Sequence, residues 1–477
     1  MDYGDFISYY YGDLFSRYPV KIDQVGPGMG AVSGGERCME FSYMGCPADT
    51  VFGYYVVQSN SLYCEESLPS FEDESCPVNN PTLPGSGVKI HREDLIAASG
   101  ISSLPISLSY RSRYSGITSL ANGGWIHNYQ ASIQHQIGTN AYIVRPNGAV
   151  YHFERYNASS PWTSIETDDE LTQTTSGWQL KLADSDAIET YNASGSLVSI
   201  LQRNGLKTTL NYNEQNQLVQ VAHPFGRTLK FGYDAAGLLT RIDTSDVQRF
   251  LFAYDVSGNL SSITYPDGRS RLFHYENKLY KSALTGVTDE SGQRIGTYSY
   301  HADGRVYETQ RASGVDRTQF VYADDVQSAP QTQIKQFNAQ GIAEQQTYNF
   351  VIKGHVLRPA SISSSSGQNG STQQTVYDEH GRKIREVNKD GRVTFYTRNA
   401  QGRVTEKATY PASYQSATTA PPLDAASGVT QTQWHPHLEP AAQNSGSLPH
   451  HELQLRQQRQ PAGADRNPDP GCHGRTR

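Results

Sequence analysis

The sequence has few charged residues and no long hydrophobic run. Only 18% of its 477 residues are Asp, Glu, Lys or Arg, and the mean hydropathy is -0.60. No window approaches the roughly 18 consecutive apolar residues of a membrane-spanning helix, so no membrane span is expected. The formal net charge of -7 gives no general attraction to nucleic acid, which is therefore not expected as a partner.

Motifs for nucleotide, metal and nucleophile chemistry are also missing. There is no P-loop and no HExxH pair, and Gly26, Gly28 and Gly30 have the wrong spacing for a dinucleotide fingerprint. The stretch around Ser33 lacks the first glycine of a nucleophile elbow and follows no convincing strand. We therefore expect a protein that is not an enzyme, with no catalytic residue, no metal ligand and no cofactor.

The histidines show no ligand spacing in the region that we expect to form strands. Each is expected at a sheet surface or a strand end, and none in a catalytic role. They are His127, His152, His223, His274 and His301.

Cysteine is scarce and unevenly placed. Four lie in one N-terminal segment, and Cys472 stands alone near the end. The four lack CxxC spacing, so they indicate two disulfides rather than a zinc site, with the pairing left open. These possible disulfide cysteines are Cys38, Cys46, Cys64 and Cys76.

Disulfides persist in oxidising compartments, so we expect an exported protein, extracellular or in the cell envelope. The first residues, however, have neither the basic nor the apolar part of a signal peptide. We therefore expect the true start to lie upstream of Met1.

A period of 21 residues, marked by tyrosine, runs through the middle of a chain that has 31 Tyr and 42 Gly. The evenly spaced residues are Tyr191, Tyr212, Tyr233, Tyr254 and Tyr275. Tyr300 follows 25 residues later, and the pattern returns at Tyr377 after an irregular stretch. Such self-similarity predicts a repeat architecture.

Other positions share the period. An acidic residue or Asn follows the tyrosine, as in Asn192, Asn213, Asp234, Asp255 and Asp378. Four residues after the tyrosine stands Gly195, Asn216, Gly237, Gly258, Gly304 or Gly381. Leucine is usual two positions later, at Leu197, Leu218, Leu239 and Leu260.

One repeat predicts one β-hairpin. The residues before each tyrosine alternate in polarity, as expected for a strand with two faces. The Gly or Asn supplies a positive φ in the turn, and the residue after the tyrosine can bond turn amides. A single hairpin cannot bury its own apolar face, so consecutive hairpins are expected to pair edge to edge into one long antiparallel sheet.

This pattern resembles the YD repeat of Rhs proteins, which also occurs in the shells of insecticidal toxin complexes and in teneurins. The resemblance covers about residues 190–410. Upstream, the stretches SCPVNNPTLPGSGVKIHREDL, ISLSYRSRYSG and GGWIHNYQASI are similar to the pre-repeat module of the same family, which extends it to about 75–411.

The resemblance implies an all-β fold in which repeats form a wound sheet, part of a hollow shell around a C-terminal toxin. It also implies a role in delivering toxins between competing cells, with a toxin polypeptide or a secretion-system component as partner. Family shells have many more repeats, a self-cleaving aspartyl-protease core and a toxin domain, none of which we find here. The sequence therefore predicts a truncated shell fragment without a toxin.

Two further interpretations remain open. The tyrosine rows, if exposed, could stack on sugars, which would make the protein a cell-surface carbohydrate-binding or adhesion protein. The turn carboxylates before glycine, as in Asp267, could bind calcium, although a role in turn formation is the simpler reading.

From residue 435 to 477 there is no Val, Ile, Phe, Tyr, Trp or Lys. The stretch HELQLRQQRQPAG is compatible, one base out of frame, with a unit that contains Tyr, Asp, Gly and Leu in the order of the repeat. We therefore expect this tail to be disordered and out of frame with a longer repeat protein. A nucleic-acid-binding tail is disfavoured because residues 451–477 hold five Arg against three acidic residues.

The expected organisation has five parts. They are an irregular cysteine-containing segment (1–78), a β-rich pre-repeat module (79–165), the YD repeats (166–411), a linker (412–434) and the tail (435–477).

Overall fold

The structure, a computed structural model, describes residues 72–433 with short gaps at 74, 101–102, 113–119, 121–123, 138, 165, 324–329, 339–340, 354–355, 366–371 and 400–401. It also describes the backbone of three short strands, β1 (Val20–Lys21), β2 (Ser42–Tyr43) and β33 (Gln443–Gly446). The chain divides into two compact units, Met1–Ser70 and Phe71–Arg477. In the first unit, β1 and β2 form an antiparallel pair.

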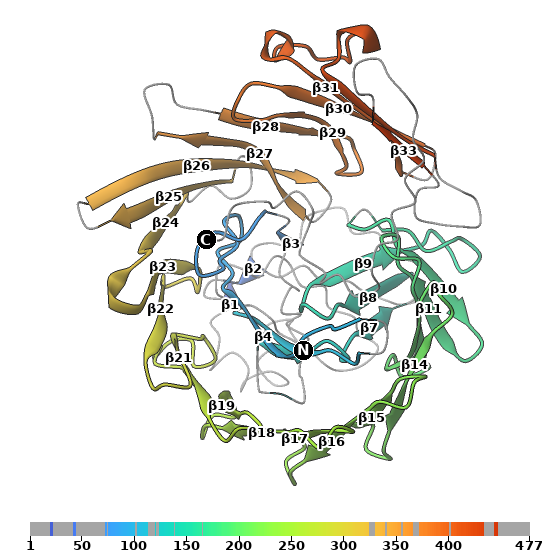
Figure 1. Ribbon diagram of the computed structural model, residues 1–477, viewed down its shortest axis with the longest axis vertical. Coiled ribbons are helices and arrows are strands. Elements are labelled where there is room, and N and C mark those ends of the chain that lie inside the picture. The colour runs from blue at the N-terminus through green and yellow to red at the C-terminus, as the bar shows by residue number, and fades with distance from the viewer. Residues whose placement is uncertain are drawn as a thin grey trace, which may run out of the picture. The chain divides into compact units, whose positions relative to one another are not determined.

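The second unit is built of strands, and its described residues contain no α-helix. Two three-stranded sheets come first, followed by one sheet of 25 strands whose neighbours in space are almost all neighbours in sequence (Figure 1). We call this the repeat sheet. The expected all-β fold, a wound sheet of consecutive antiparallel hairpins, is confirmed.

The small sheets contain β4 (Ile90–Ile96), β5 (Ile106–Arg111) and β6 (Trp125–His127), then β7 (Ser132–Ile137), β8 (Asn140–Val144) and β9 (Val150–Glu154).

The first half of the repeat sheet contains β10 (Glu170–Thr174), β11 (Gly177–Lys181), β12 (Ile188–Asn192), β13 (Leu197–Leu201), β14 (Lys207–Tyr212), β15 (Leu218–Ala222), β16 (Thr228–Tyr233), β17 (Leu239–Thr244), β18 (Arg249–Tyr254), β19 (Leu260–Thr264), β20 (Ser270–His274) and β21 (Gly286–Thr288).

The second half contains β22 (Arg294–Tyr300), β23 (Val306–Arg311), β24 (Thr318–Tyr322), β25 (Gln331–Asn338), β26 (Gly341–Lys353), β27 (Val356–Ser364), β28 (Thr372–Tyr377), β29 (Lys383–Val387), β30 (Val393–Arg398), β31 (Val404–Tyr410), β32 (Gly428–Gln433) and β33, together with β3 (Glu72–Asp73).

The turns have the geometry that the repeat predicts. After Tyr254, the Oδ1 atom of Asp255 accepts hydrogen bonds from the amides of Ser257 (2.8 Å) and Asn259 (2.9 Å). Gly258 has φ +79°, and the strand pairing shifts by a bulge next to Tyr254. A turn followed by a left-handed residue and a bulge is a common short hairpin connection.

The same arrangement recurs at the other predicted turn positions. Paired amide bonds to the side-chain oxygen are found at Asn192, Asn213, Asp234 and Asp378. Positive φ is found at Gly195, Asn216, Gly237, Gly304 and Gly381.

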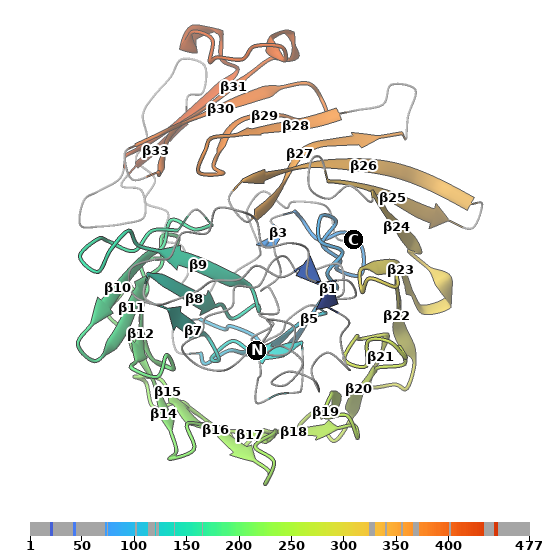
Figure 2. The same cartoon turned by 180° about the vertical axis from the view of Figure 1, so that it is seen from behind.

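The repeat sheet buries one of its faces. In β18, Phe250 and Phe252 are almost completely buried, whereas Leu251 between them is 44% exposed. The buried face belongs to a core cluster that extends from Leu104 to Tyr298, so it includes β5 to β9 as well as the repeats. In both views the small sheets lie on the inner side of the curve of β10–β24 (Figure 2).

Two smaller clusters continue the core along the repeat sheet. One contains Val306, Phe320, Ile334, Tyr348, Phe350 and Leu357. The other contains Val387, Val393, Phe395, Ala408 and Tyr410.

The structure differs from the expected organisation at residues 412–434, which were predicted to form a linker. This segment contains the 3-10 turns Ala412–Tyr414 and Leu423–Ala425, and then β32, which pairs with β31 and so continues the repeat sheet. The hydroxyl of Tyr410 donates to the carbonyl of Pro421 at 2.7 Å. The sequence of this segment is rich in Ala, Pro and Thr, and such a composition does not indicate these tertiary contacts.

The N-terminal boundary also differs. Residues up to 78 were expected to form a separate irregular segment, but β3 pairs in parallel with β27 as a member of the repeat sheet. A two-residue strand is too short to leave a periodic signature. Most of the predicted tail, apart from β33, lies outside the described residues.

Candidate functional site

Seven of the repeat tyrosines are tied to the repeat before them. The hydroxyl of each donates a hydrogen bond to a backbone carbonyl of the preceding repeat, and we call this contact a tyrosine clasp. The clasps are Tyr212–Leu197 (2.7 Å), Tyr233–Leu218 (2.8 Å), Tyr254–Leu239 (2.6 Å), Tyr275–Leu260 (3.0 Å), Tyr300–Leu284 (2.6 Å), Tyr322–Val306 (2.9 Å) and Tyr377–Pro359 (2.9 Å).

The clasps explain why tyrosine rather than phenylalanine marks the repeat. The rings of Tyr212, Tyr233 and Tyr254 are half-buried against the core. Burial raises the pKa of Tyr212 and Tyr254, so both hydroxyls keep the proton that they donate. These tyrosines therefore face inward and use their hydroxyls inside the sheet, instead of forming exposed rows.

Tyr191 has no earlier repeat to clasp, and it takes part in a buried ion pair. Arg145, from the turn between β8 and β9, contacts Glu189 of β12 through both nitrogens, at 2.6 and 3.1 Å. The Tyr191 hydroxyl donates to the same carboxylate at 2.6 Å. Arg145, Glu189 and Tyr191 are each 5% exposed or less, so this cluster joins β7–β9 firmly to the first repeat.

The β4–β6 sheet is attached through aromatic side chains. The Tyr110 hydroxyl donates to the carbonyl of Ser282 at 2.9 Å and accepts from the amide of Leu284 at 2.8 Å. Trp125 Nε1 donates to the hydroxyl of Tyr275 at 2.8 Å. The hydroxyl group of Tyr275 thus bonds both the preceding repeat and the β4–β6 sheet.

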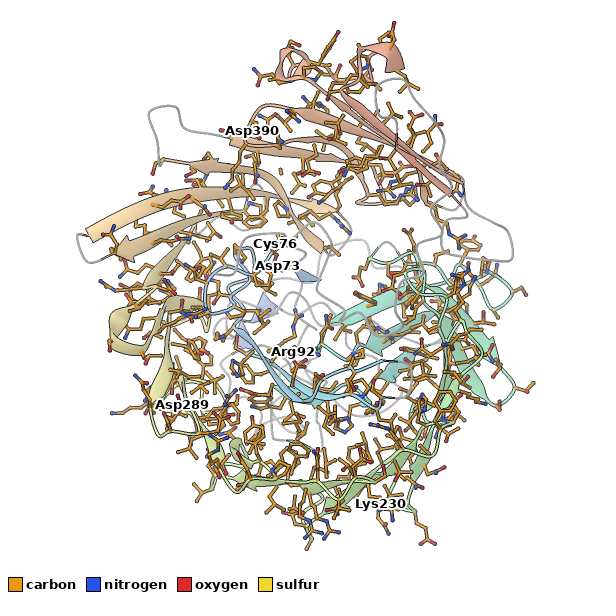
Figure 3. All side chains as sticks on the ribbon, viewed as in Figure 1. Asp73, Cys76, Arg92, Lys230, Asp289 and Asp390 are labelled. Atoms are coloured by element: carbon orange, nitrogen blue, oxygen red, sulfur yellow. The ribbon has the colours of Figure 1, made fainter. Side chains whose placement is uncertain are left out.

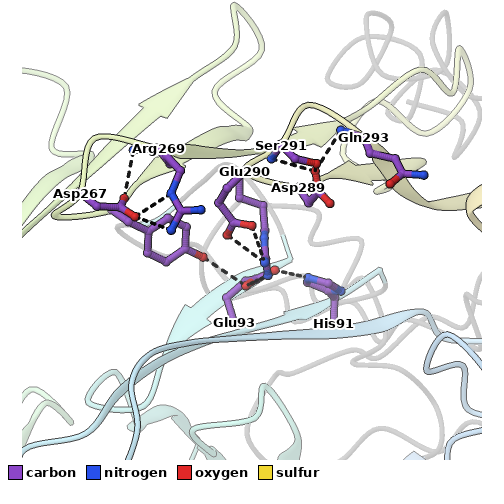
Figure 4. A network of polar contacts seen from close by, with 10 residues as sticks. His91, Glu93, Asp267, Arg269, Asp289, Glu290, Ser291 and Gln293 are labelled. Carbon is purple, nitrogen blue, oxygen red and sulfur yellow. Dashed lines mark hydrogen bonds and ion pairs between the residues drawn. The ribbon is translucent and has the colours of Figure 1, made fainter.

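A polar network lies at the same interface (Figure 4). Glu93 of β4 is 3% exposed, and it contacts His91 at 2.6 Å and Arg271 of β20 at 2.5 Å. Arg271 also contacts Glu290 at 2.9 Å. Burial by itself would lower the pKa of Arg271, but the carboxylates of Glu93 and Glu290 outweigh it and the pKa is raised.

The opposite side chains of β4 point away from this network. Arg92 pairs with Asp94 at 2.7 Å, and both are about half exposed. Figure 3 shows Arg92 on β4, and Lys230 and Asp289 on the repeat sheet. The alternation of inward His91 and Glu93 with outward Arg92 and Asp94 is that of a strand with one buried face.

The segment before β4 crosses the next repeats. Asn79 donates to Thr318 at 2.9 Å, Thr332 donates to the carbonyl of Pro84 at 2.7 Å, and the Val306 amide donates to the carbonyl of Gly87 at 2.9 Å. Together, residues 73–145 contact repeat strands from β12 to β27. We call residues 73–154 the inner module.

Of the four predicted disulfide cysteines, the structure describes one. Cys76 is disulfide-bonded, and Figure 3 shows it close to Asp73. Its partner, and Cys38, Cys46 and Cys64, lie outside the described residues. The pairing stays a prediction.

The described residues contain no group of three or more His, Cys, Asp or Glu side chains that could hold a metal ion. A cavity of about 590 Å³ near β28 and β29 is lined by polar side chains, among them Thr372, Gln374, Asp390 and Gln415. In the part of the chain that is described, no helix is long and apolar enough to cross a membrane.

Sequence reasoning found the repeat tyrosines, turn acids and glycines, but missed Glu93, Arg145 and Glu189. Glu93 and Glu189 lie within strands, and Arg145 directly follows one. Glu189 and Tyr191 are two positions apart and therefore share one face, which is the signal that could have indicated a buried charge.

The teneurin YD-shell family matches residues 159–416. No curated protein matches the chain. Among solved structures, TcdB2-TccC3 is similar at 11% identity, with 70% of this chain and 23% of that chain covered and a TM-score of 0.34. The Photorhabdus luminescens Tc holotoxin pore is also similar at 11% identity, with 72% and 22% covered and a TM-score of 0.35. The chain thus spans less than a quarter of the length of these solved chains.

Proposed function

The chain belongs to the teneurin YD-shell family, and from this membership we propose that it is a structural wall segment of a repeat shell, without catalytic activity. The shell would enclose or deliver a polypeptide cargo such as a toxin. The observation that carries this proposal is the unbroken run of tyrosine clasps from Tyr212 to Tyr322, which links successive hairpins into one continuous wall.

The physics of the repeat supports a wall rather than a set of independent domains. Each hairpin depends on its neighbours to cover its apolar face and to satisfy the tyrosine hydroxyls. The wall has one apolar face and one polar face, and the inner module covers part of the apolar face. Such a surface suits the enclosure of a chain more than the recognition of a small substrate.

Cargo and cellular location follow from the same proposal. The partner would be a toxin polypeptide or a component of a secretion system, and the protein would act outside the cytoplasm. The disulfide at Cys76 supports export, because disulfides persist in oxidising compartments.

The test is protection of a fused cargo. An unstructured reporter polypeptide is joined after Arg477, and its digestion by a protease is compared with that of the same reporter added as a separate chain. We expect slower cleavage of the fused reporter. A matched fusion that carries Leu239→Asp and Ile242→Asp, two buried positions of β17, should lose this protection. Equal cleavage in all three samples would contradict the proposal.

The carbohydrate-binding alternative depended on exposed tyrosine rows. Since the repeat tyrosines are half-buried with bonded hydroxyls, no specific observation favours it. A glycan-binding assay on the full chain should give no signal above background.

A further inference from the structure

Three basic side chains of the inner module lie against the apolar face of the repeat sheet. Lys89 directly precedes β4, His91 is on β4, and His127 ends β6. Lys89 and His127 are completely buried, and the His91 side chain is 15% exposed. Each lies against an aromatic ring of a different repeat strand, on β22, β20 and β16.

Within the described structure, Lys89 forms no ion pair with a carboxylate. Its Nζ lies 4.3 Å from the ring centre of Tyr298, and it donates to the carbonyls of Pro81 (3.2 Å) and Ile90 (2.5 Å). Burial lowers the pKa of Lys89 from 10.5 to about 7. The ammonium form is therefore held only by carbonyl dipoles and a ring face.

His91 is enclosed by two rings and three charged groups. It meets Trp125 and Phe273 edge to face, each with 6.0 Å between ring centres. The Glu93 carboxylate forms a hydrogen bond with Nε2 of His91 and favours the charged form of the imidazole. The positive charges of Lys89 and Arg271 disfavour that charged form. Burial is the largest effect, and the pKa of His91 is lowered.

His127 has the most apolar surroundings of the three. Its ring centre lies 5.3 Å from that of Phe231. Its Nδ1 accepts a hydrogen bond from the Tyr129 amide at 3.2 Å, so the neutral ring carries its proton on Nε2, which has no partner in the described structure. No charged group offsets the burial, which lowers the pKa of His127 from 6.5 to about 3.

We propose that the β4–β6 sheet is a pH-sensitive lock on the repeat sheet, which is docked while Lys89, His91 and His127 are uncharged and is released when acid charges them. Protonation of His127 would remove the acceptor for the Tyr129 amide and leave an imidazolium against Phe231. A charge on Lys89 would lie against Tyr298 without a counter-ion. The released sheet would carry the same groups into water, where their charged forms are well solvated.

The direction of the effect follows from linkage. Above pH 6.5, His127 is neutral in both the docked and the released state. Between pH 6.5 and about pH 3, His127 binds a proton in the released state but not in the docked state. Docking through His127 therefore weakens as pH falls from 6.5 to 3, by about thirtyfold between pH 8 and pH 5. Protonation of Lys89 in the released state also weakens docking, as pH falls from 10.5 to about 7. Protonation of His91 weakens docking further below pH 6.5.

The test is hydrogen exchange of the full chain at pH 8 and pH 5, corrected for the intrinsic exchange rate. We expect peptides from β4–β6 to lose protection by about tenfold or more at pH 5, while β14–β19 change little. The variant Lys89→Met/His91→Gln/His127→Asn removes the titrating groups and keeps the hydrogen bonds of both histidines, because Asn can accept at the Nδ1 position. It should abolish the loss.

A matched control, Lys230→Met/His380→Asn, changes exposed residues and should behave as the unmodified chain. If β4–β6 of the triple variant is already unprotected at pH 8, the single variant His127→Asn is used instead. It should remove the part of the loss of protection at pH 5 that His127 causes. Equal loss in the unmodified chain and the His127 variant would overturn the proposal, as would loss of β14–β19 together with β4–β6. No cargo is used, so the result is independent of the proposed shell function.

Discussion

At the scale of single residues, the tyrosine hydroxyl is the group that links one repeat to the next. Phenylalanine would fill the same space but would leave a carbonyl without its donor, and each unsatisfied buried group costs free energy. Buried charged groups also have partners: Arg145 forms an ion pair with Glu189, and Glu93 forms one with Arg271.

Tyr254→Phe removes the clasp to Leu239 while it keeps the ring. We expect the free energy of unfolding to fall by about 1 kcal/mol, the usual net contribution of one hydrogen bond. Urea denaturation measures the change. Tyr156→Phe is the control, because Tyr156 is 93% exposed. If both variants lose the same stability, the clasp has no role of its own.

Glu189→Gln leaves the Arg145 guanidinium buried without the carboxylate that it bonds. Breaking a buried pair costs about 3–5 kcal/mol, so we expect a large fall in the denaturation midpoint. The matched control is Glu170→Gln, whose side chain is 66% exposed and 3.9 Å from Lys181. An exposed pair of this kind contributes about 0–1 kcal/mol, so similar midpoints for the two variants would contradict the assignment.

At the scale of elements, the hairpin turns could be predicted almost completely. A side-chain oxygen followed by a left-handed glycine is a local signal, and the turns at Asp234, Asp255 and Asp378 follow it. Strands β3 and β32 could not be predicted, because their pairing partners decide whether they form. His127 does end a strand as expected, but its side chain is buried and not at a surface.

Gly268 and Gly428 form a matched pair for testing the turns. A Cβ atom at either position would meet nothing within 4 Å, but only Gly268 has a positive φ, at +82°. Gly268→Ala should therefore cost about 1–2 kcal/mol through backbone strain alone. Gly428→Ala should be close to neutral or slightly stabilising. Thermal unfolding of both variants is the measurement, and equal effects would exclude the role of the left-handed turn.

At the scale of the whole molecule, the core is divided. The largest cluster joins the inner module to strands β10–β22, and the clusters around Phe320 and Phe395 are separate from it. In a repeat protein, stability is close to a sum over units and their contacts. Regions with smaller clusters are expected to open at lower free energy.

Phe395→Ala should therefore reduce hydrogen-exchange protection in β28–β32 and leave β14–β19 unchanged. Phe252→Ala, in the large cluster, should reduce protection in the β14–β19 region and in the inner module together. Each truncation of a buried Phe costs about 3–5 kcal/mol locally. If Phe395→Ala lowers protection equally in both regions, the repeat sheet is one cooperative unit and this prediction is wrong.

What the sequence by itself determined is the repeating hairpin: its period, its turn residues and the alternation that buries one face. These features are local, because a turn is set by a few neighbouring residues and a strand face by every second residue. Only the tertiary structure decided where the tyrosine hydroxyls bind and which charges are buried. Contacts such as Tyr110–Ser282 and Trp125–Tyr275 join residues 172 and 150 positions apart, and no local pattern encodes such a pairing.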